Sequence, residues 1–328
     1  MVDLTILIIA HNRKSFLLDA VSSCLNQTVS KKRYEIIVVK NFTDEYIDRK
    51  LEELGIINVN TAFHSLGEKI VIGVDKAQGN IISILEDDDL FLPNKIEKVL
   101  KMFNNYNIGY YHNSYVHIDT KQRILGYPIK LNKPLLLIQQ RDKQKYVDKL
   151  IFKYYSIYNN SSISIDKPII IKNKNYIKNF TYALDIFLFY AGIASDKGIY
   201  FDTEVLTKQR IHKLNSKVRD DNFESWLLKM RDRLKISIKE FTLISEFLKE
   251  QNISSKFVNF MISDRKICLA RLPNECSPKE NLGIKDILNY IDFHRKSIRD
   301  ILQLLLIFAP KKFRLDAAKR WYETEVSL

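Results

Sequence analysis

The chain has 328 residues, 46% of them hydrophobic and 28% charged, which suits one large or two medium globular domains. Nine glycines and seven prolines beside 17 tyrosines and 18 phenylalanines argue against disorder. The net charge of +13 favours anionic partners such as nucleotide diphosphates, phosphate-linked lipids or an anionic membrane face, whereas no zinc-finger, helix-turn-helix or RRM-like pattern supports specific nucleic-acid binding.

The cysteines and the apolar runs bear on the compartment. Cys24, Cys268 and Cys276 show no CxxC or metal-ligand spacing, which favours reduced thiols and an intracellular location. No apolar run approaches the ~20 residues that span a bilayer. Leu4–Ala10 lacks a basic segment before it and a cleavage pattern after it, so the sequence predicts a strand there and not a signal peptide.

Strand-like and helix-like segments alternate over the first hundred residues. Continuous apolar runs predict buried strands, and amphipathic segments predict helices. Strands are expected at 4–10, 34–39 and 81–85, and helices at 15–26, 44–54, 67–77 and 94–103. This alternation with short connections predicts an α/β fold with a mainly parallel sheet, whose ligands bind beyond the carboxyl ends of the strands.

The pattern changes along the rest of the chain. Strands are expected within 109–125 (with a turn at 120–122), at 163–165 and at 199–210, and helices at 182–194, 222–239, 241–250, 284–308 and 312–322. Residues 159–162 form a polar cluster, and 168–179 are expected to be peripheral. The β signal fades beyond about residue 219, which places a domain boundary near 216.

One stretch, IISILEDDDLFLP at 81–93, joins a buried strand to an acidic loop and a helix. Four adjacent carboxylates, Glu86, Asp87, Asp88 and Asp89, repel one another, and burying any of them is costly unless a cation neutralises it. Mg2+ and Mn2+ prefer such oxygen ligands, often shared with a phosphate. A metal site and a solvated acidic turn are the two interpretations of this stretch.

Several segments together resemble one family, the GT-A-fold nucleotide-sugar glycosyltransferases of the inverting family 2. The resemblance covers residues 3 to about 216. It is carried, in chain order, by TILIIAHNRKSFLLDAVSSCLNQT, YEIIVVKNFTDE, AQGNIISILEDDDLFLP, YYHNSYVHID, NNSSISI, YALDIFLFYAG and the Arg210-Ile211-His212 segment with Ser216. It implies a Rossmann-like GT-A domain, a mainly parallel sheet flanked by helices, at 1–216. Residues 217–328 are then a helical extension for acceptor, oligomer or membrane-surface contacts.

The resemblance also implies an activity. It predicts a metal-dependent, inverting transferase that moves a sugar from a nucleoside diphosphate sugar to the hydroxyl of a glycan or lipid-linked acceptor. Mn2+ or Mg2+ would be the cofactor, and a UDP-sugar is the favoured donor. The divalent ion would neutralise the diphosphate as the sugar leaves it.

The resemblance assigns roles to particular residues. Asp185 matches the family's catalytic base. Asp88 is the principal metal ligand, with Glu86 and His212 beside it, and Asp89 faces the donor sugar or has a structural role. Nucleotide-binding positions, including carboxylates that face the ribose, are Ala10, His11, Arg13, Lys40, Asn41, Lys69, Glu86, Asp87 and Arg210.

Two positions depart from the family pattern. Leu184 stands where an acidic residue usually precedes the base, and Lys40-Asn41 stand where an Asp usually contacts the nucleotide base. These departures favour one alternative, a catalytically weakened GT-A-fold binding protein. A second alternative is a nucleotidyltransferase, which usually has a glycine-rich phosphate loop after the first strand. The HNRKSF segment contains no glycine.

The C-terminal region offers a further surface. The apolar run 301–309 is followed by basic residues at Lys311, Lys312 and Arg314, which suits either an interfacial membrane contact or a packed core helix with a solvated basic end. The protein is expected in the cytoplasm, with a peripheral position on the inner membrane face as one option. Oligomer formation is compatible with the sequence.

Overall fold

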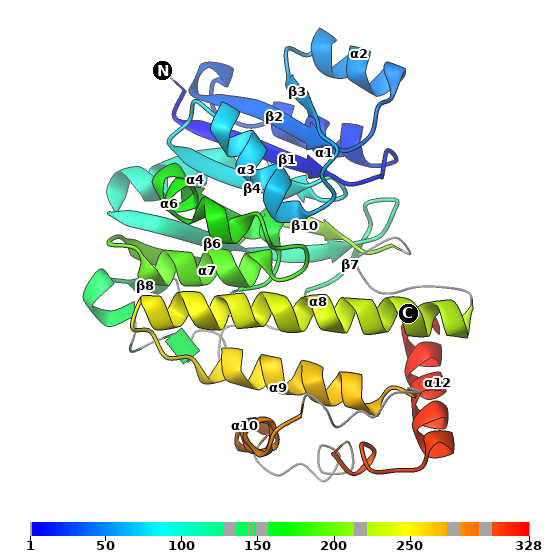
Figure 1. The fold of residues 1–328 in the computed structure, drawn as a ribbon. Helices are drawn as coiled ribbons and strands as arrows, with labels where there is room; N and C mark the ends of the chain where they lie inside the picture. Colours follow the sequence, from blue (N-terminus) through cyan, green and yellow to red (C-terminus); the bar gives the residue numbers. More distant parts are fainter. Residues whose placement is uncertain are drawn as a thin grey trace. The chain divides into compact units, whose positions relative to one another are not determined.

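The structure is a computed structural model that describes residues 2–127, 136–143, 145, 147–148, 157–212, 222–273, 282–294 and 304–327. The chain forms two compact units, residues 1–212 and 213–328, and each is described here by itself (Figure 1). The boundary predicted near 216 falls within residues 213–221, outside the described residues.

Unit 1 is built on one sheet in the order β3-β2-β1-β4-β9-β6-β10-β5, with β7 beside β6 and β8 beside β10 (Figure 1). Its strands are β1 (Leu4–Ala10), β2 (Tyr34–Lys40), β3 (Ile57–Asn60), β4 (Ile81–Glu86), β5 (Leu90–Phe91), β6 (Ile108–Ile118), β7 (Ile124–Gly126), β8 (Leu136–Ile138), β9 (Ile163–Asp166) and β10 (Gly198–Arg210).

The strand directions bring several carboxyl ends to one edge. β1 runs parallel to β2 and β4, and β10 runs parallel to β6. β9 lies antiparallel between β4 and β6, so these two strands point the same way. The α/β prediction is confirmed. The sheet as a whole is mixed, because β9 and the short strands β5, β7 and β8 pair antiparallel with their neighbours.

Helices cover both faces of this sheet. They are α1 (Leu17–Leu25), α2 (Glu45–Glu53), α3 (Leu66–Lys76), α4 (Lys95–Asn105), α6 (Lys167–Ile177) and α7 (Leu184–Ala194). Ile6 and Ile8 of β1 belong to the core that β1 shares with α1, α2 and α4. Leu7 points to the opposite face, since a Cβ added to Gly73 of α3 would lie 2.2 Å from its side chain. A strand covered on both faces must be apolar throughout, which explains the unbroken run at 4–10.

Unit 2 is helical in its described part. It consists of α8 (Phe223–Glu250), α9 (Lys256–Arg271), α10 (Ile284–His294) and α12 (Lys311–Ser327). Trp226 is fully buried, and Met230 and Leu234 extend its core along α8. Trp321 and Tyr322 of α12 pack against Trp226. Unit 2 therefore has a hydrophobic core of its own.

Some sequence predictions differ from the observed elements. Residues 223–250 form one helix where two were predicted, because no glycine or proline interrupts them. Helix α6 lies in the segment expected to be peripheral, with Pro168 in its first turn, where proline is well tolerated. Helix α9 and the short strand β3 were not predicted. Helix α10 covers the first part of the helix expected over 284–308, and residues 295–303 of that prediction lie outside the described residues.

Within the described residues, no helix combines the length and the apolar character needed to cross a bilayer.

Candidate active site

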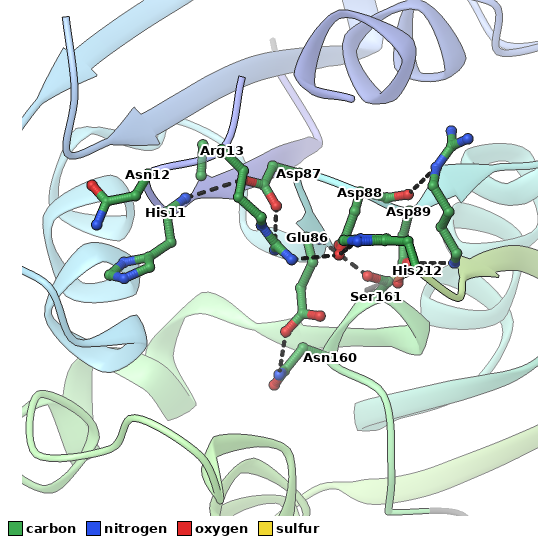
Figure 2. Close-up of polar contacts among 12 residues, drawn as sticks. His11, Asn12, Arg13, Glu86, Asp87, Asp88, Asp89, Asn160, Ser161 and His212 are labelled. Atoms are coloured by element: carbon green, nitrogen blue, oxygen red, sulfur yellow. Dashed lines mark hydrogen bonds and ion pairs between the residues drawn. The ribbon is translucent and has the colours of Figure 1, made fainter. Parts of the chain in front are cut away.

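Three segments meet at the carboxyl edge of the unit 1 sheet. They are the turn after β1 (11–13), the acidic loop Glu86–Asp89 after β4, and residues 210–212 at the end of β10. The backbone joins two of them directly, since Asp87 N donates to Ile9 O at 3.2 Å. Segments far apart in the sequence thus supply side chains to one site (Figure 2).

Asp87 fastens the acidic loop to the turn after β1. Its Oδ2 accepts from His11 N at 3.0 Å, and its Oδ1 lies 2.5 Å from Arg13 Nη2. Burial raises the pKa of Asp87 to about 7, and the charge of Arg13 opposes that shift. With both oxygens engaged by protein donors, Asp87 holds the loop in place.

Asp88 lies between two cationic or potentially cationic side chains. Its Oδ2 accepts from Arg13 Nη1 at 2.7 Å and lies 2.9 Å from His212 Nε2 (Figure 2). Its Oδ1 is buried and has no hydrogen-bond partner among the described residues. The predicted neighbours Asp88 and His212 are therefore brought together, and one carboxylate oxygen remains available.

Glu86, Asp88 and Asp89 each offer an oxygen, and these atoms all lie within 4.8 Å of one another. Burial, and next the charge of Asp88, raises the pKa of both Glu86 and Asp89. In the described structure Asp89 Oδ2, like Asp88 Oδ1, is buried without a partner. Clustered carboxylates with orphaned oxygens are the donor set that Mg2+ or Mn2+ prefers, so these residues fit a divalent cation.

Arg210 lies fully buried beneath the acidic loop. Its Nε donates to Asp88 O at 2.9 Å, and its backbone N donates to Asp89 Oδ1 at 2.9 Å. Its Nη2 lies 3.1 Å from Asp19, and its guanidinium stacks over Phe16 at 4.3 Å. Through these hydrogen bonds Arg210 holds the acidic loop in its conformation.

A buried lysine of α3, Lys69, contacts the turn after β1. Lys69 Nζ donates to Ala10 O at 2.9 Å and lies 2.9 Å from His11 Nδ1. Burial is the main cause that lowers the pKa of Lys69 to about 8 and that of His11 to about 4, and the Lys69 charge adds to the latter. His11 is thus a neutral imidazole that accepts a hydrogen bond from Lys69.

Lys40, the last residue of β2, and Asn41, which follows it, have different surroundings. Lys40 is fully buried and its Nζ contacts Asp48 at 2.7 Å, Asn60 Oδ1 at 2.5 Å and Phe42 O at 2.7 Å. Its ammonium is therefore enclosed by protein groups. Asn41 remains at the surface.

Asn41 connects the turn after β1 to the loop before α3. Its Oδ1 accepts from Asn12 N at 3.0 Å, and its Nδ2 lies 3.1 Å from His64 Nδ1. The His64 ring meets the His11 ring edge-on at 5.8 Å. Sequence reasoning did not find His64, since a single histidine in a loop carries no recognisable spacing.

Asp185 lies in the first turn of α7 and is half-buried. Its Oδ1 accepts from Ile186 N at 2.8 Å and its Oδ2 accepts from Asn159 N at 3.1 Å. Burial among apolar neighbours raises its pKa to about 7, and the charge of Glu86 acts in the same direction. Leu184 beside it is fully buried, which adds to the apolar surroundings.

The polar cluster at 159–162 joins the acidic loop to Asp185. Asn160 Nδ2 donates to Glu86 Oε1 at 3.0 Å, and Ser161 Oγ accepts from Glu86 N at 3.0 Å (Figure 2). The sequence marked this cluster as polar but gave its residues no role. Their contacts depend on β9 returning between β4 and β6, which no local pattern reveals.

Comparison with solved structures shows which known fold this chain resembles. The fold resembles that of Staphylococcus aureus TarS, residues 1–349 in complex with UDP-GlcNAc, with a TM-score of 0.58 and 11% identity over 98% of this chain and 90% of that one. The same protein in complex with UDP gives a TM-score of 0.53 and 12% identity, over 90% and 93% of the two chains. The mixed sheet flanked by helices is thus the fold that this chain shares with TarS.

Sequence comparison shows which known proteins this chain is similar to. Residues 5–163 match the model of glycosyl transferase family 2. An uncharacterized glycosyltransferase of Rickettsia prowazekii (strain Madrid E) is 27% identical over 282 residues, 80% of this chain and 85% of that protein. One of Rickettsia bellii (strain RML369-C) is 30% identical over 125 residues, which are 37% of this chain and 18% of that protein. The family model thus matches just under half of the chain, and this N-terminal part is similar to glycosyl transferase family 2.

Proposed function

We propose that this chain transfers a sugar from a nucleoside diphosphate sugar to an acceptor hydroxyl, with a divalent metal and with inversion at the anomeric carbon. One observation carries the proposal. Asp185, with its pKa raised to about 7, lies within electrostatic reach of Glu86, in a cluster where Asp88 and Asp89 have unpartnered buried oxygens. A base and a cation site side by side are what glycosyl transfer requires.

Asp185 acts as the general base. Its carboxylate takes the proton of the acceptor hydroxyl while that oxygen bonds to the anomeric carbon. The bond between this carbon and the diphosphate oxygen breaks, and the diphosphate leaves from the opposite side. A pKa of about 7 makes the carboxylate a better proton acceptor than an ordinary aspartate while it stays largely ionised near pH 7.5.

The acidic loop binds the cofactor and the diphosphate end of the donor. Asp88 is the principal ligand, and Glu86, Asp89 and His212 complete the set that would hold Mn2+ or Mg2+. When bound, the cation neutralises charge on the departing diphosphate. Arg13 and Arg210 keep the loop in its shape through their contacts with Asp88.

The nucleotide binds over the ends of β1 and β2. The groups offered there are Ala10, His11, Arg13, Asn41, Lys69 and Asp87. The ammonium of Lys40, at the end of β2, is already enclosed by protein groups. A UDP-sugar is the donor we favour, since TarS, which shares the fold, binds UDP and UDP-GlcNAc.

The acceptor and the location are further parts of the proposal. A glycan or lipid-linked hydroxyl is the acceptor, and the protein acts in the cytoplasm, where unit 2 can meet the inner membrane face. Phe308 and Phe313 are 63% and 61% exposed, and Lys311 and Lys312 lie between them in the sequence. This combination suits an anionic lipid surface, although residues 301–303 of the predicted apolar run lie outside the described residues.

Calorimetric titration tests the metal and donor site. UDP should bind the wild-type protein in the presence of Mn2+ and lose at least about tenfold in affinity without it or in Asp88→Asn. Asp292→Asn is the matched control, because this aspartate is highly exposed on α10. Binding of UDP that ignores both Mn2+ and Asp88→Asn would contradict the metal site.

Turnover separates the proposed function from its alternatives. UDP release from a panel of UDP-sugars should occur with wild-type protein and disappear in Asp185→Asn. Nucleotide binding without release would favour the weakened binding protein. Pyrophosphate-dependent formation of a nucleoside triphosphate from a UDP-sugar would instead favour a nucleotidyltransferase.

A further inference from the structure

The turn that follows residue 158 begins in an unusual backbone conformation. Asn159 has φ +79° and ψ +99°, a left-handed region that residues other than glycine rarely adopt. Its side chain folds back on the turn, where Oδ1 accepts from Ser161 N at 3.0 Å and Nδ2 donates to Ser162 Oγ at 3.3 Å. Asparagine tolerates this conformation because such local hydrogen bonds compensate for it.

This conformation directs the backbone amide of Asn159 at Asp185. The N–H donates to Asp185 Oδ2 at 3.1 Å, opposite the amide of Ile186 on Oδ1. Rotation about φ sets the direction of this N–H relative to the rest of the turn. A relaxed φ would therefore turn the amide away from the carboxylate.

The next two residues of the same turn hold the acidic loop. Asn160 donates to the side chain of Glu86, and Ser161 accepts from its backbone amide, both at 3.0 Å (Figure 2). Three consecutive residues thus engage the base and the acidic loop at once.

A buried lysine also binds the turn at residues 159–162. Lys95 is fully buried, and its Nζ donates to Ser161 O at 2.5 Å and to Thr207 Oγ1 at 3.0 Å. The Thr207 hydroxyl also donates to Ser161 O, at 3.1 Å. The turn is therefore fastened to α4 and to β10, and it cannot shift without breaking buried hydrogen bonds.

We propose that Asn159 is a positioning residue whose left-handed backbone aims an amide at the base Asp185 while its turn holds Glu86, so that base and acidic loop keep one fixed relation. This inference rests on the role of Asp185 in the proposed function. Asn159 acts through Asp185.

Two substitutions at Asn159 test the inference. Alanine disfavours positive φ and should turn the amide away, whereas glycine accepts positive φ and should keep it in place. In Asn159→Ala the pKa of Asp185 should rise by about one unit, because a hydrogen bond that stabilises the ionised form is lost. In Asn159→Gly that pKa should stay at the wild-type value. Carbon-13 NMR of labelled aspartate carboxyls, assigned with Asp185→Asn, measures it.

The other titratable groups near Asp185 must be the same in the wild-type protein and in both variants. Among the described residues, Glu86 of β4 and Tyr110 and Tyr115 of β6 interact electrostatically with Asp185, and neither variant changes them. Asn252→Ala is the control for alanine at positive φ, since Asn252 has φ +53° in the turn between α8 and α9. It should lower stability to a similar degree without moving the Asp185 titration.

Kinetics give a second readout. Asn159→Ala should lower kcat for UDP-sugar turnover by about tenfold with little change in UDP affinity, because a misdirected base affects the reaction and not the binding. An equal loss in kcat and in UDP affinity would indicate a general structural role and contradict positioning.

The NMR outcome decides the inference independently of turnover. If wild-type protein consumes no UDP-sugar, the proposed function fails while the titration still tests the geometry. An unchanged Asp185 titration in Asn159→Ala would overturn the inference. If that variant does not fold, Asn159→Gly still decides, since a shift of about one unit there would show that the side chain, not the backbone conformation, orients the base.

Discussion

Both units bury charged side chains, but those of unit 1 gather around its acidic loop, whereas Glu240, Asp286 and Arg314 of unit 2 lie outside its aromatic cluster. Unit 1 buries the charged groups of Lys69, Lys95 and Arg210 around its acidic loop. The described core of unit 2 centres on Trp226, with aromatic and aliphatic neighbours. Both units are compact, so the difference is not one of packing alone.

These two kinds of burial affect the free energy of the folded state in opposite directions. An aromatic core lowers the free energy of the folded state through apolar burial, whereas a buried charge raises it unless partners compensate. Both units keep some buried polar atoms without a partner in the described structure, but the unpartnered carboxylate oxygens, Asp88 Oδ1 and Asp89 Oδ2, lie in unit 1. Groups held in that state at the end of a sheet are available to a ligand.

The largest expected effect comes from removing the proposed base. Asp185→Asn should lower kcat for UDP-sugar turnover by about 10³-fold, because the amide cannot accept the acceptor proton. Single-turnover measurement of UDP release checks this. Retention of wild-type turnover would remove Asp185 from the mechanism.

The next largest effect tests the core of unit 2. Trp226→Ala should lower the free energy of unfolding by about 3–5 kcal/mol, since it empties the centre of the aromatic cluster. Urea denaturation followed by circular dichroism measures it. Leu228→Ala on the same helix is the control, because Leu228 is 58% exposed; equal losses in both variants would mean that Trp226 does not anchor this core.

A smaller effect with the opposite sign is expected for the stability of Asp185→Asn. The folded-state pKa of about 7 lies above the ordinary 3.8, so the native state holds this proton more tightly than the unfolded chain. The resulting stabilisation is fully present below pH ~4 and is lost as pH rises through 7. At pH 8 the buried charge costs stability, and Asn should raise the free energy of unfolding by about 2 kcal/mol, discounted for partial exposure.

Thermal unfolding at several pH values measures that effect. The gain should be present at pH 8 and nearly absent at pH 4, where the wild-type carboxyl is already neutral. A gain that does not depend on pH would assign it to packing and not to charge.

The smallest effect is expected from a surface ion pair of unit 2. Lys256 and Asp292 lie 3.4 Å apart with both side chains more than 70% exposed. Asp292→Asn should change the free energy of unfolding by less than about 0.5 kcal/mol. A larger loss in urea denaturation would mean that unit 2 also depends on charge pairs.

Local patterns predicted much of unit 1. Apolar runs indicated β1, β2 and β4 because strands covered on both faces leave no polar alternation to confuse the assignment. The antiparallel entry of β9 was not predictable, because strand order is a long-range property. In unit 2 the helix α9 was missed, since its buried positions include Ser263 and polar residues interrupt its apolar face.

The site shows the same division. The acidic loop and Asp185 were candidates from the sequence, because adjacent carboxylates after a buried strand and a lone carboxylate in an apolar helix are locally unusual. Lys40 and Lys69 looked alike in the sequence, and only the structure shows Lys40 enclosed by Asp48 and Asn60 while Lys69 bonds His11.

The sequence by itself determined the α/β class, the family resemblance and the chemical groups of the site, since these depend on residue type and on order along the chain. Tertiary structure decided which of those groups meet, because hydrogen bonds between distant residues, such as Asn160 and Glu86, 74 positions apart, follow from strand order and helix packing. Asn159 is one case: its φ of +79° and the contact of its amide with Asp185 are visible only in the folded structure, where β9 pairs with β4.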